Sequence, residues 1–272
     1  MKKIIYLVFA ALCALQGSAQ TKPRNSIGLT VGWQNFTVLD KHVSPLRYST
    51  NSLFPKLGLF YNKETNRSIL DVQVSASKGT IHPSRFGERR YKAVWSAKDS
   101  FQYSLASKFI HANIEASYLR NVSSLSTDKF NYWVGGTLNE AAYYGDEVAS
   151  SDWLLNVADL APSFQIGYLP LNNHKLTIRV DLSVLGVITR PIYALFPKSN
   201  KDKNLPAYFK QGTQLASLDK FQKVNFQVGY QYQVGRHFAA GVLYRLKWLH
   251  YSLPADVRAV DKQFDIKLSY TY

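Results

Sequence analysis

The sequence contains almost no sulfur. Its 272 residues include one cysteine, Cys13, and one methionine, Met1. Because Cys13 lies in the apolar stretch at the beginning of the chain, the rest of the sequence can form no disulfide, no thiolate zinc site and no cysteine nucleophile. Packing and hydrogen bonding must therefore stabilise the fold.

Long hydrophobic runs are also missing after the first two dozen residues, although 46% of all residues are hydrophobic. A membrane-spanning helix needs about 20 consecutive apolar residues. The body of the chain therefore has no predicted helical span, and its hydrophobic residues must be arranged in another way.

Acidic residues are scarce, because 18 Asp and Glu stand against 33 Lys and Arg and leave a net charge of +15. Such a charge suits nucleic acid, but the basic residues are spread along the chain and no nucleic-acid-binding motif is present. The sequence also lacks a glycine-rich phosphate loop, metal-ligand spacing and a nucleotide fingerprint. We therefore expect no nucleic-acid partner, no metal and no cofactor, and we favour anionic lipid or polysaccharide as the partner.

The first twenty residues, MKKIIYLVFAALCALQGSAQ, have the layout of a secretory signal peptide. Lys2 and Lys3 give a positive start, an apolar stretch follows, and small residues precede the predicted cleavage site after Ala19. We expect residues 1–19 to be removed during Sec-dependent export. Residues 20–272 should then form one domain, because no linker or change of composition divides them.

Hydrophobic side chains recur at every second position through this domain, as in KLTIRVDLSVLG (175–186) and IHANIEASY (110–118). Such alternation indicates half-buried β-strands. The last nine residues, FDIKLSYTY, follow the same rule. Their apolar face consists of Phe264, Ile266, Leu268, Tyr270 and Tyr272.

The alternation predicts ten strands, near residues 25–38, 53–62, 67–77, 99–120, 128–145, 153–169, 175–190, 222–234, 237–250 and 260–272. The three long connections, 39–52, 78–98 and 191–221, all fall at one end of these strands. The connections at the other end are short. A change of parity between Leu105 and Ile110 indicates a bulge, or a strand that leaves the membrane.

Long loops at one end and short turns at the other are typical of outer-membrane barrels, whose extracellular loops are longer than their periplasmic turns. The edges of an open sheet would leave unpaired backbone groups in lipid, so the strands must close. The sequence thus predicts an all-β fold, a single closed antiparallel transmembrane β-barrel of ten strands. Eight or twelve strands remain as alternatives if 99–120 or 191–221 is misread.

Aromatic residues fit the same orientation, because Tyr and Trp are enriched where a barrel wall meets the headgroups. The predicted periplasmic ends carry Tyr118, Tyr132, Tyr168, Tyr232 and Tyr272. The predicted outer ends carry Trp33, Tyr143, Trp153 and Trp248. The alternative is that these side chains belong to the core of the protein.

With a signal ending at Ala19-Gln20, Tyr-rich alternating strands and a last strand ending at Tyr272, the chain resembles the outer-membrane β-barrel proteins of Bacteroidetes-type Gram-negative bacteria. The resemblance implies a location in the outer membrane. It also implies that the apolar face of the last strand, Phe264 to Tyr272, is the signal read by the barrel-assembly machinery. It is architectural, so it names no activity, and partner proteins other than this machinery stay unknown.

The lumen of a ten-stranded barrel has a backbone radius of roughly 10 Å, which inward side chains largely fill. Eight charged residues fall on the polar faces of the predicted strands: Asp71, Glu115, Arg179, Asp181, Arg245, Lys247, Asp265 and Lys267. Unpaired charges in so narrow a space would be costly. We therefore predict a charge-paired plug rather than a wide conduit.

Two sets of residues have the chemistry of a catalytic site. Asp40, His42, His82 and His250 fall near the outer rim, where an Asp–His pair could activate water. His111, Glu115 and Ser117 share one strand face and have the inventory of a serine hydrolase, although alternate residues on a strand lie about 7 Å apart. We interpret these three as polar lumen residues and assign no catalytic residue.

Basic residues gather in two of the predicted outer loops: Arg85, Arg89, Arg90, Lys198, Lys201 and Lys203. These side chains could bind the phosphate and carboxylate groups of lipopolysaccharide or surface glycans, or could simply be solvated. Three functions remain open. The first is a surface binding or structural protein, the second a small-solute pore, and the third an outer-membrane lipid hydrolase or protease with a rim site.

Overall fold

The computed structural model describes residues 24–94, 100–127, 129–148, 151–171, 173–190, 209–210 and 212–272. No helix in these ranges is long and apolar enough to cross a membrane. The strands are β1 (Arg24–Asp40), β2 (Arg47–Thr50), β3 (Leu53–Glu64), β4 (Ser68–Pro83), β5 (Arg90–Val94), β6 (Ser100–Ser104), β7 (Ser107–Asn121), β8 (Phe130–Val148), β9 (Ser151–Leu171), β10 (His174–Ser183), β11 (Leu185–Thr189), β12 (Thr213–Ser217), β13 (Phe221–Val234), β14 (Phe238–Tyr251) and β15 (Val257–Thr271).

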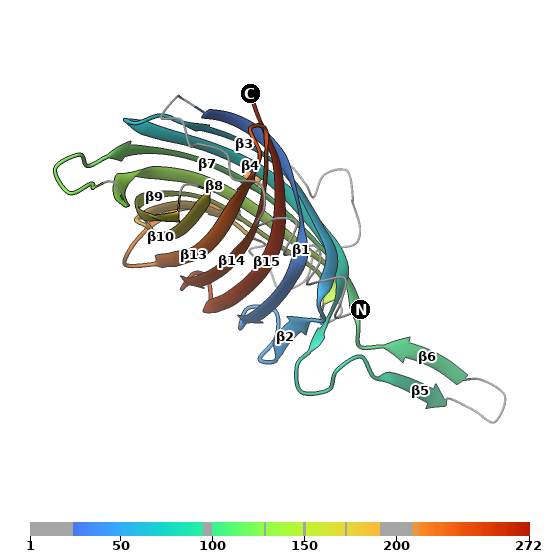
Figure 1. Cartoon of the computed structure of the whole chain (residues 1–272). Helices are drawn as coiled ribbons and strands as arrows, with labels where there is room; N and C mark the ends of the chain where they lie inside the picture. The colour runs from blue at the N-terminus through green and yellow to red at the C-terminus, as the bar shows by residue number, and fades with distance from the viewer. Residues whose placement is uncertain are drawn as a thin grey trace, which may run out of the picture.

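Thirteen of these strands form one antiparallel sheet that closes into a barrel (Figure 1). β1 pairs with β15 without interruption from Ser26↔Thr271 to Asp40↔Val257. β2 and β3 both pair with β1, β10 and β11 both pair with β9, and β12 and β13 pair with β11 and β10. Each of these three pairs is one broken strand, so the thirteen strands fill ten positions around the ring. The predicted ten-stranded barrel is confirmed.

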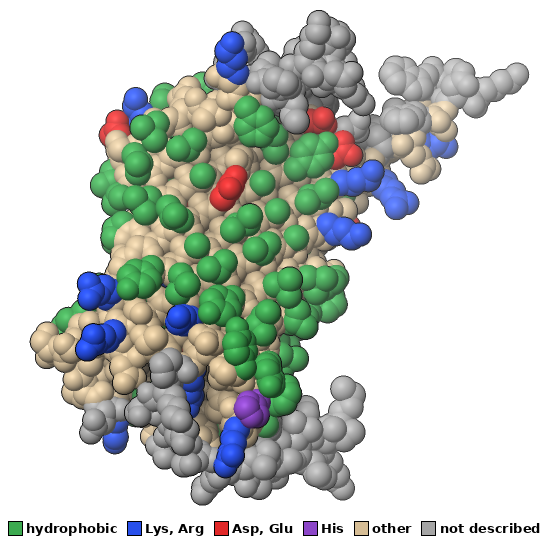
Figure 2. Space-filling model, turned by 90° about the horizontal axis from the view of Figure 1, so that it is seen from above, with side chains coloured by type: hydrophobic (Ala, Val, Ile, Leu, Met, Phe, Trp, Pro, Cys, Tyr) green, Lys and Arg blue, Asp and Glu red, His purple; other side chains and the backbone are tan. Residues whose placement is uncertain are grey.

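The two faces of the wall differ as the alternation predicts. On β15, the side chains of Phe264 to Tyr272 in the predicted apolar face are 41–63% exposed and point outward. Their neighbours Asp265 and Ser269 are buried inside the barrel. Figure 2 shows hydrophobic side chains spread over the outer face, with an acidic side chain among them. This surface is the one that a barrel presents to lipid.

The acidic residue Glu140 lies on this outer face. Its Oε1 accepts a hydrogen bond of 3.3 Å from Asn156 Nδ2 on the neighbouring strand. Ile114 and Ala158 lie opposite Glu140 in the register of β7 and β9, and Leu138 precedes it on the same face. The Glu140 carboxylate therefore has apolar neighbours on the outer face of the wall.

The two ends of the barrel differ in the length of their connections. At one end, called the short-turn end, the chain reverses between β3 and β4 and between β13 and β14 within three residues. At the opposite end, called the long-loop end, β5 and β6 form a separate hairpin that projects beyond the barrel (Figure 1). The break between Ser104 and Ser107 explains the change of parity, because the chain leaves the barrel wall there.

Some of the predicted elements were incomplete. The loop predicted at 39–52 contains β2, and the loop predicted at 191–221 contains β12. Both strands extend the wall at the long-loop end. The predicted outer ring of aromatic residues was wrong in two places, because Tyr143 and Trp153 are 5% and 2% exposed and lie inside the lumen. Trp33 and Trp248 do point outward, at 40% and 38% exposure.

Candidate functional site: a closed lumen and a polar pocket

An apolar layer fills the lumen at the long-loop end. Phe36 is central in it, with its ring stacked on Phe109 at 5.2 Å and on Tyr143 at 4.7 Å between centroids. Because these side chains are almost fully buried, the layer closes this end of the lumen. Its members are Phe36, Val38, Tyr48, Leu53, Ile81, Phe109, Ala141, Tyr143, Val148, Trp153, Leu155, Val157, Ile188, Ala216, Phe221, Leu249, Tyr251, Val257 and Ala259.

Asp40, at the end of β1, fastens the loops above this layer. Its Oδ2 accepts a hydrogen bond of 2.9 Å from Trp153 Nε1, and its Oδ1 lies 2.6 Å from Arg190 Nη2. Arg190 Nη1 in turn donates to the carbonyl oxygens of Leu253 and Ala255. One buried carboxylate therefore connects β1 and β9 with Arg190, directly after β11, and through it with the loop that follows β14.

A charged layer lies below the apolar layer. Among the described residues, six cationic and six anionic side chains are buried, counting the Asp40–Arg190 pair above, so the buried charges balance although the chain as a whole is strongly basic. The members of the charged layer are Lys56, Glu115, Asp159, Arg179, Asp181, Lys223, Arg245, Lys247, Asp261 and Asp265. The excess positive charge must therefore lie elsewhere.

The pair between Lys56 and Asp265 is the most deeply buried, with both side chains fully inaccessible. Lys56 Nζ lies 2.9 Å from Oδ1 and 2.7 Å from Oδ2. Gly32 on β1 lies between the two strands that carry them, and a Cβ at this position would collide with Asp265 and the backbone of Phe264. Glycine at position 32 thus leaves the space in which the carboxylate sits.

Arg179 organises the other side of the charged layer. Its Nε donates to Asp181 Oδ1 at 2.7 Å, its Nη1 donates to Ser117 at 3.0 Å, and its Nη2 donates to Thr137. Glu115 lies 3.9 Å from the same guanidinium. The predicted charge-paired plug is confirmed for five of its eight residues, which form buried ion pairs: Glu115, Arg179, Asp181, Arg245 and Asp265. Lys247 is buried in the same layer, where its Nζ donates to Asn113, and the remaining two, Asp71 and Lys267, are half-buried in a pocket below it.

The residues with the inventory of a serine hydrolase are polar lumen residues, as we interpreted them. His111 stacks on Tyr143 at 4.7 Å, and neither of its ring nitrogens has a hydrogen-bond partner. Ser117 accepts its bond from Arg179 rather than from a histidine. No nucleophile–base pair is formed here.

The structure does not bring the four rim residues together. The backbone nitrogen of His42 donates to Asp40, and His82 Nδ1 lies 4.0 Å from Glu88. His250 instead bonds Asp256 at 2.7 Å. Within the described ranges no group of three or more histidine and carboxylate side chains could hold a metal ion.

The loop between β14 and β15 carries the residue that pairs with His250. Partial burial raises the pKa of the Asp256 carboxyl, but the hydrogen bond from His250 and the charges of Arg258 and Lys41 outweigh it. The pKa of Asp256 therefore lies below its usual value. This carboxylate fastens the loop between β1 and β2 through Lys41, whose Nζ lies 3.4 Å away.

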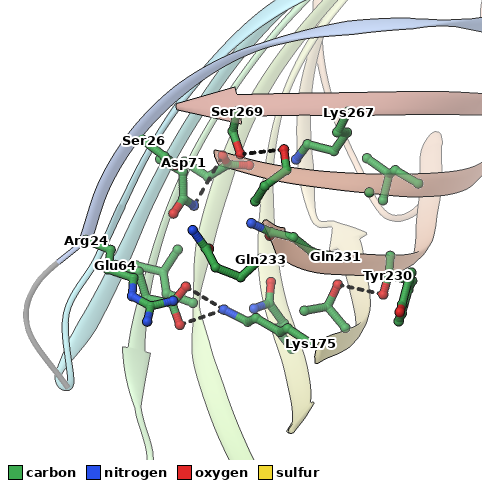
Figure 3. A pocket seen from close by; sticks show the side chains of 18 of the residues that line it. Arg24, Ser26, Glu64, Asp71, Lys175, Tyr230, Gln231, Gln233, Lys267 and Ser269 are labelled. Atoms are coloured by element: carbon green, nitrogen blue, oxygen red, sulfur yellow. Dashed lines mark hydrogen bonds and ion pairs between the residues drawn. The ribbon is translucent and has the colours of Figure 1, made fainter. Parts of the chain in front are cut away.

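A polar pocket of about 560 Å³ opens at the short-turn end (Figure 3). Figure 3 shows Asp71 and Lys267 at one side and the ion pair of Lys175 with Glu64 at the other, with Gln233 between them. The Lys267 ammonium lies 4.2 Å from the centre of the Phe60 ring. Sequence reasoning placed Asp71 and Lys267 in the lumen but missed this pocket.

The predicted basic loop residues are described only in part. Arg85, Arg89 and Arg90 are exposed, before and at the start of the β5–β6 hairpin. Lys198, Lys201 and Lys203 lie outside the described residues, as do the predicted signal peptide and its cleavage site. Binding of anionic lipid by these side chains stays a prediction.

The fold is that of known barrels of the outer membrane. The outer membrane protease OmpT of Escherichia coli superposes with a TM-score of 0.55 at 9% identity, covering 94% of this chain and 99% of that one. The toluene transporter TodX of Pseudomonas putida gives 0.34 at 9% identity over 96% and 93%, and OprG of Pseudomonas aeruginosa gives 0.34 at 7% over 95% and 99%. The assignment rests on the first of these. No family model and no curated protein sequence matches the chain.

Proposed function

We propose that this protein is an integral outer-membrane β-barrel that acts as a surface binding or structural protein and does not conduct solutes. The carrying observation is the filling of its lumen by two successive layers. The apolar layer excludes water at the long-loop end, and the charged layer joins opposite walls below it. Moving a solute through would require breaking both layers, and breaking a buried ion pair typically costs about 3–5 kcal/mol.

The outer face supports the location. Its large hydrophobic side chains are exposed to the surroundings at alternate positions from Phe264 to Tyr272, as lipid contact requires. The resemblance to Bacteroidetes-type proteins and the cleavage after Ala19 belong to the same proposal. Recovery of the folded chain as a detergent-free periplasmic monomer would refute it.

Planar-bilayer recording tests the closed lumen. The purified full chain, shown to be folded by its heat-modifiable migration on a gel, should give no stable conductance steps. A stable stepwise conductance would refute the proposal and favour the small-solute pore. The enzymatic alternative has less support, because the rim residues do not assemble and the likeness to a protease extends only to the fold.

We also propose that the exposed arginines before and on β5 bind phosphate groups of lipopolysaccharide. Arg85, Arg89 and Arg90 lie at the long-loop end, and arginine binds phosphate in a bidentate manner. Replacing all three by Gln should lower the lipopolysaccharide that co-purifies with the chain. The matched control replaces Arg67, Arg120 and Arg236, which are exposed at the short-turn end. Equal lipid content in the two variants would mean that the arginines are merely solvated.

The apolar face of β15, Phe264 to Tyr272, is proposed as the assembly signal. It is exposed and continuous in the structure, and a recognition machinery could reach it before the barrel closes. Removing Ser269–Tyr272 should cause loss of the chain from the outer membrane and its degradation. Normal surface levels of the truncated chain would contradict this role.

A further inference from the structure

The polar pocket at the short-turn end lies outside the two layers that fill the lumen, and the proposed function assigns it no role. Its volume of about 560 Å³ lies within the range of small-molecule sites, roughly 300–1,000 Å³. Arg245 and Arg179 of the charged layer line the inner end of the pocket. A molecule that enters from the short-turn end therefore has to leave the same way, as from a binding site.

Two hydrogen-bond donors in this pocket have no acceptor. Lys267 is half-buried and rests on the Phe60 ring, and its ammonium makes no ion pair or hydrogen bond with the described residues. Trp133 lines the pocket, is 3% exposed, and its Nε1 has no partner. By contrast, Lys175 on the opposite wall is held by Glu64, with Nζ 2.6 Å from Oε1. Burying the Trp133 N–H without an acceptor is costly, and a ligand in the pocket can supply acceptors to both donors.

The remaining lining favours a ligand with hydroxyl groups. Asp71, bonded only weakly to Asn62 at 3.5 Å, offers carboxylate oxygens to a donor. Ser26, Gln231, Gln233 and Ser269 present further hydroxyl and amide groups. A purely anionic molecule would be repelled by Asp71. A molecule with both a carboxylate and hydroxyl groups can pair its carboxylate with Lys267 and donate hydrogen bonds from its hydroxyl groups to Asp71.

We infer that the polar pocket binds a small polyhydroxylated carboxylate, such as a sugar acid. Its carboxylate lies against Lys267, its hydroxyl groups donate to Asp71 and the amide oxygens, and Trp133 Nε1 donates to one of its oxygens. This inference goes beyond the proposed function, and conductance measurements do not decide it.

Calorimetric titration of the folded full chain in detergent micelles tests the inference with three probes. D-Glucuronate should bind, D-glucose should bind at least tenfold more weakly because it lacks the carboxylate, and acetate should also bind at least tenfold more weakly because it lacks the hydroxyl groups. Absence of glucuronate binding, or equal binding of glucose, would overturn the inference.

Variants place the binding in the pocket. Lys267→Met should weaken glucuronate binding about 10- to 100-fold, since a charge-assisted hydrogen bond is lost, and Lys267→Arg should recover part of it. Lys129→Met is the matched control, because Lys129 is exposed at the same end but does not line the pocket. If Lys267→Met does not fold, Gln233→Phe near the β13–β14 turn fills the pocket instead and should abolish binding. Unchanged binding in folded Gln233→Phe, or an equal loss in Lys129→Met, would refute the site.

Discussion

The inner and outer faces of the same strands follow opposite rules for charge. Inside, every buried cation is matched in number by a buried anion, and the two kinds of side chain meet across the lumen. Outside, Glu140 stands among hydrophobic side chains, and within the described part of the chain its one hydrogen-bond partner is the amide of Asn156. The difference teaches that a narrow lumen tolerates many charges because each finds a partner there, whereas lipid supplies none.

Removing one partner of a buried ion pair in the lumen should have the largest effect on stability. Lys56→Met leaves the Asp265 carboxylate buried without its main partner, and we expect the free energy of unfolding to fall by about 3–5 kcal/mol. Combining it with Asp265→Leu removes the orphaned charge and should restore part of the loss. Urea unfolding in micelles measures both. Lys63→Met, exposed on the same strand, should change stability by no more than about 0.5 kcal/mol; a similar loss there would contradict the assignment.

The next effect concerns the hydrogen bond that joins the apolar layer to Asp40. Trp153→Phe keeps an aromatic ring but removes the Nε1 donor, so a buried carboxylate loses one bond. We expect a loss of about 1.5–3 kcal/mol in the free energy of unfolding. Trp33→Phe is the comparison, because this indole points outward and stacks on Phe54. Equal losses in the two variants would show that ring size, not the hydrogen bond, matters.

On the outer face, removing a charged group should increase the free energy of unfolding. Glu140→Leu replaces a lipid-facing carboxyl group with a hydrocarbon, and we expect the free energy of unfolding in phospholipid vesicles to rise by about 1–2 kcal/mol. Asp146→Leu, on the same strand near Lys108 at the rim, should bring no such gain. A destabilised Glu140→Leu variant would show that Glu140 has a stabilising partner in the membrane.

The smallest effect is expected for Asp256, in the loop between β14 and β15, which belongs to neither face of the wall. Since the pKa of Asp256 in the folded chain lies below its unfolded value of about 3.9, its contribution is present above that pH and is lost as the pH falls through the folded pKa. Wild type and Asp256→Asn should differ by less than about 1 kcal/mol at pH 7 and converge as the pH is lowered below the folded pKa of Asp256. Unfolding midpoints over a series of pH values measure this, and a difference that stays constant throughout the series would refute it.

The sequence was most informative about the outer face. Alternation predicted which side chains of β15 point outward, because lipid requires an apolar residue at nearly every such position. The ten positions around the ring followed from the same signal. The strand breaks did not, because the shift after Val184 and the four-residue β2 leave too little periodicity to detect.

The contents of the lumen were only partly predictable. Charges on polar strand faces predicted the plug, yet which charges pair depends on strands far apart in the sequence. The apolar layer was missed because inward Phe36 and outward Trp33 look alike in composition, and the aromatic residues Tyr143 and Trp153 fit a headgroup ring equally well. The pocket forms where inward side chains from different strands do not contact one another, and the local sequence pattern does not predict such contacts.

The buried ion pair of Lys56 with Asp265, which spans β1 where the barrel closes, also has a kinetic consequence. Lys56 and Asp265 are 209 residues apart, and β1 lies between the strands that carry them. An unclosed sheet keeps both charges in water, so their dehydration and the closure of a very long chain loop fall on the same late step. Strands β1 to β15 can pair with their neighbours one after another, whereas β1 and β15 pair with each other only when the barrel closes. A chain halted before that moment would display a long unpaired edge on β1, which is the surface most prone to join with another chain.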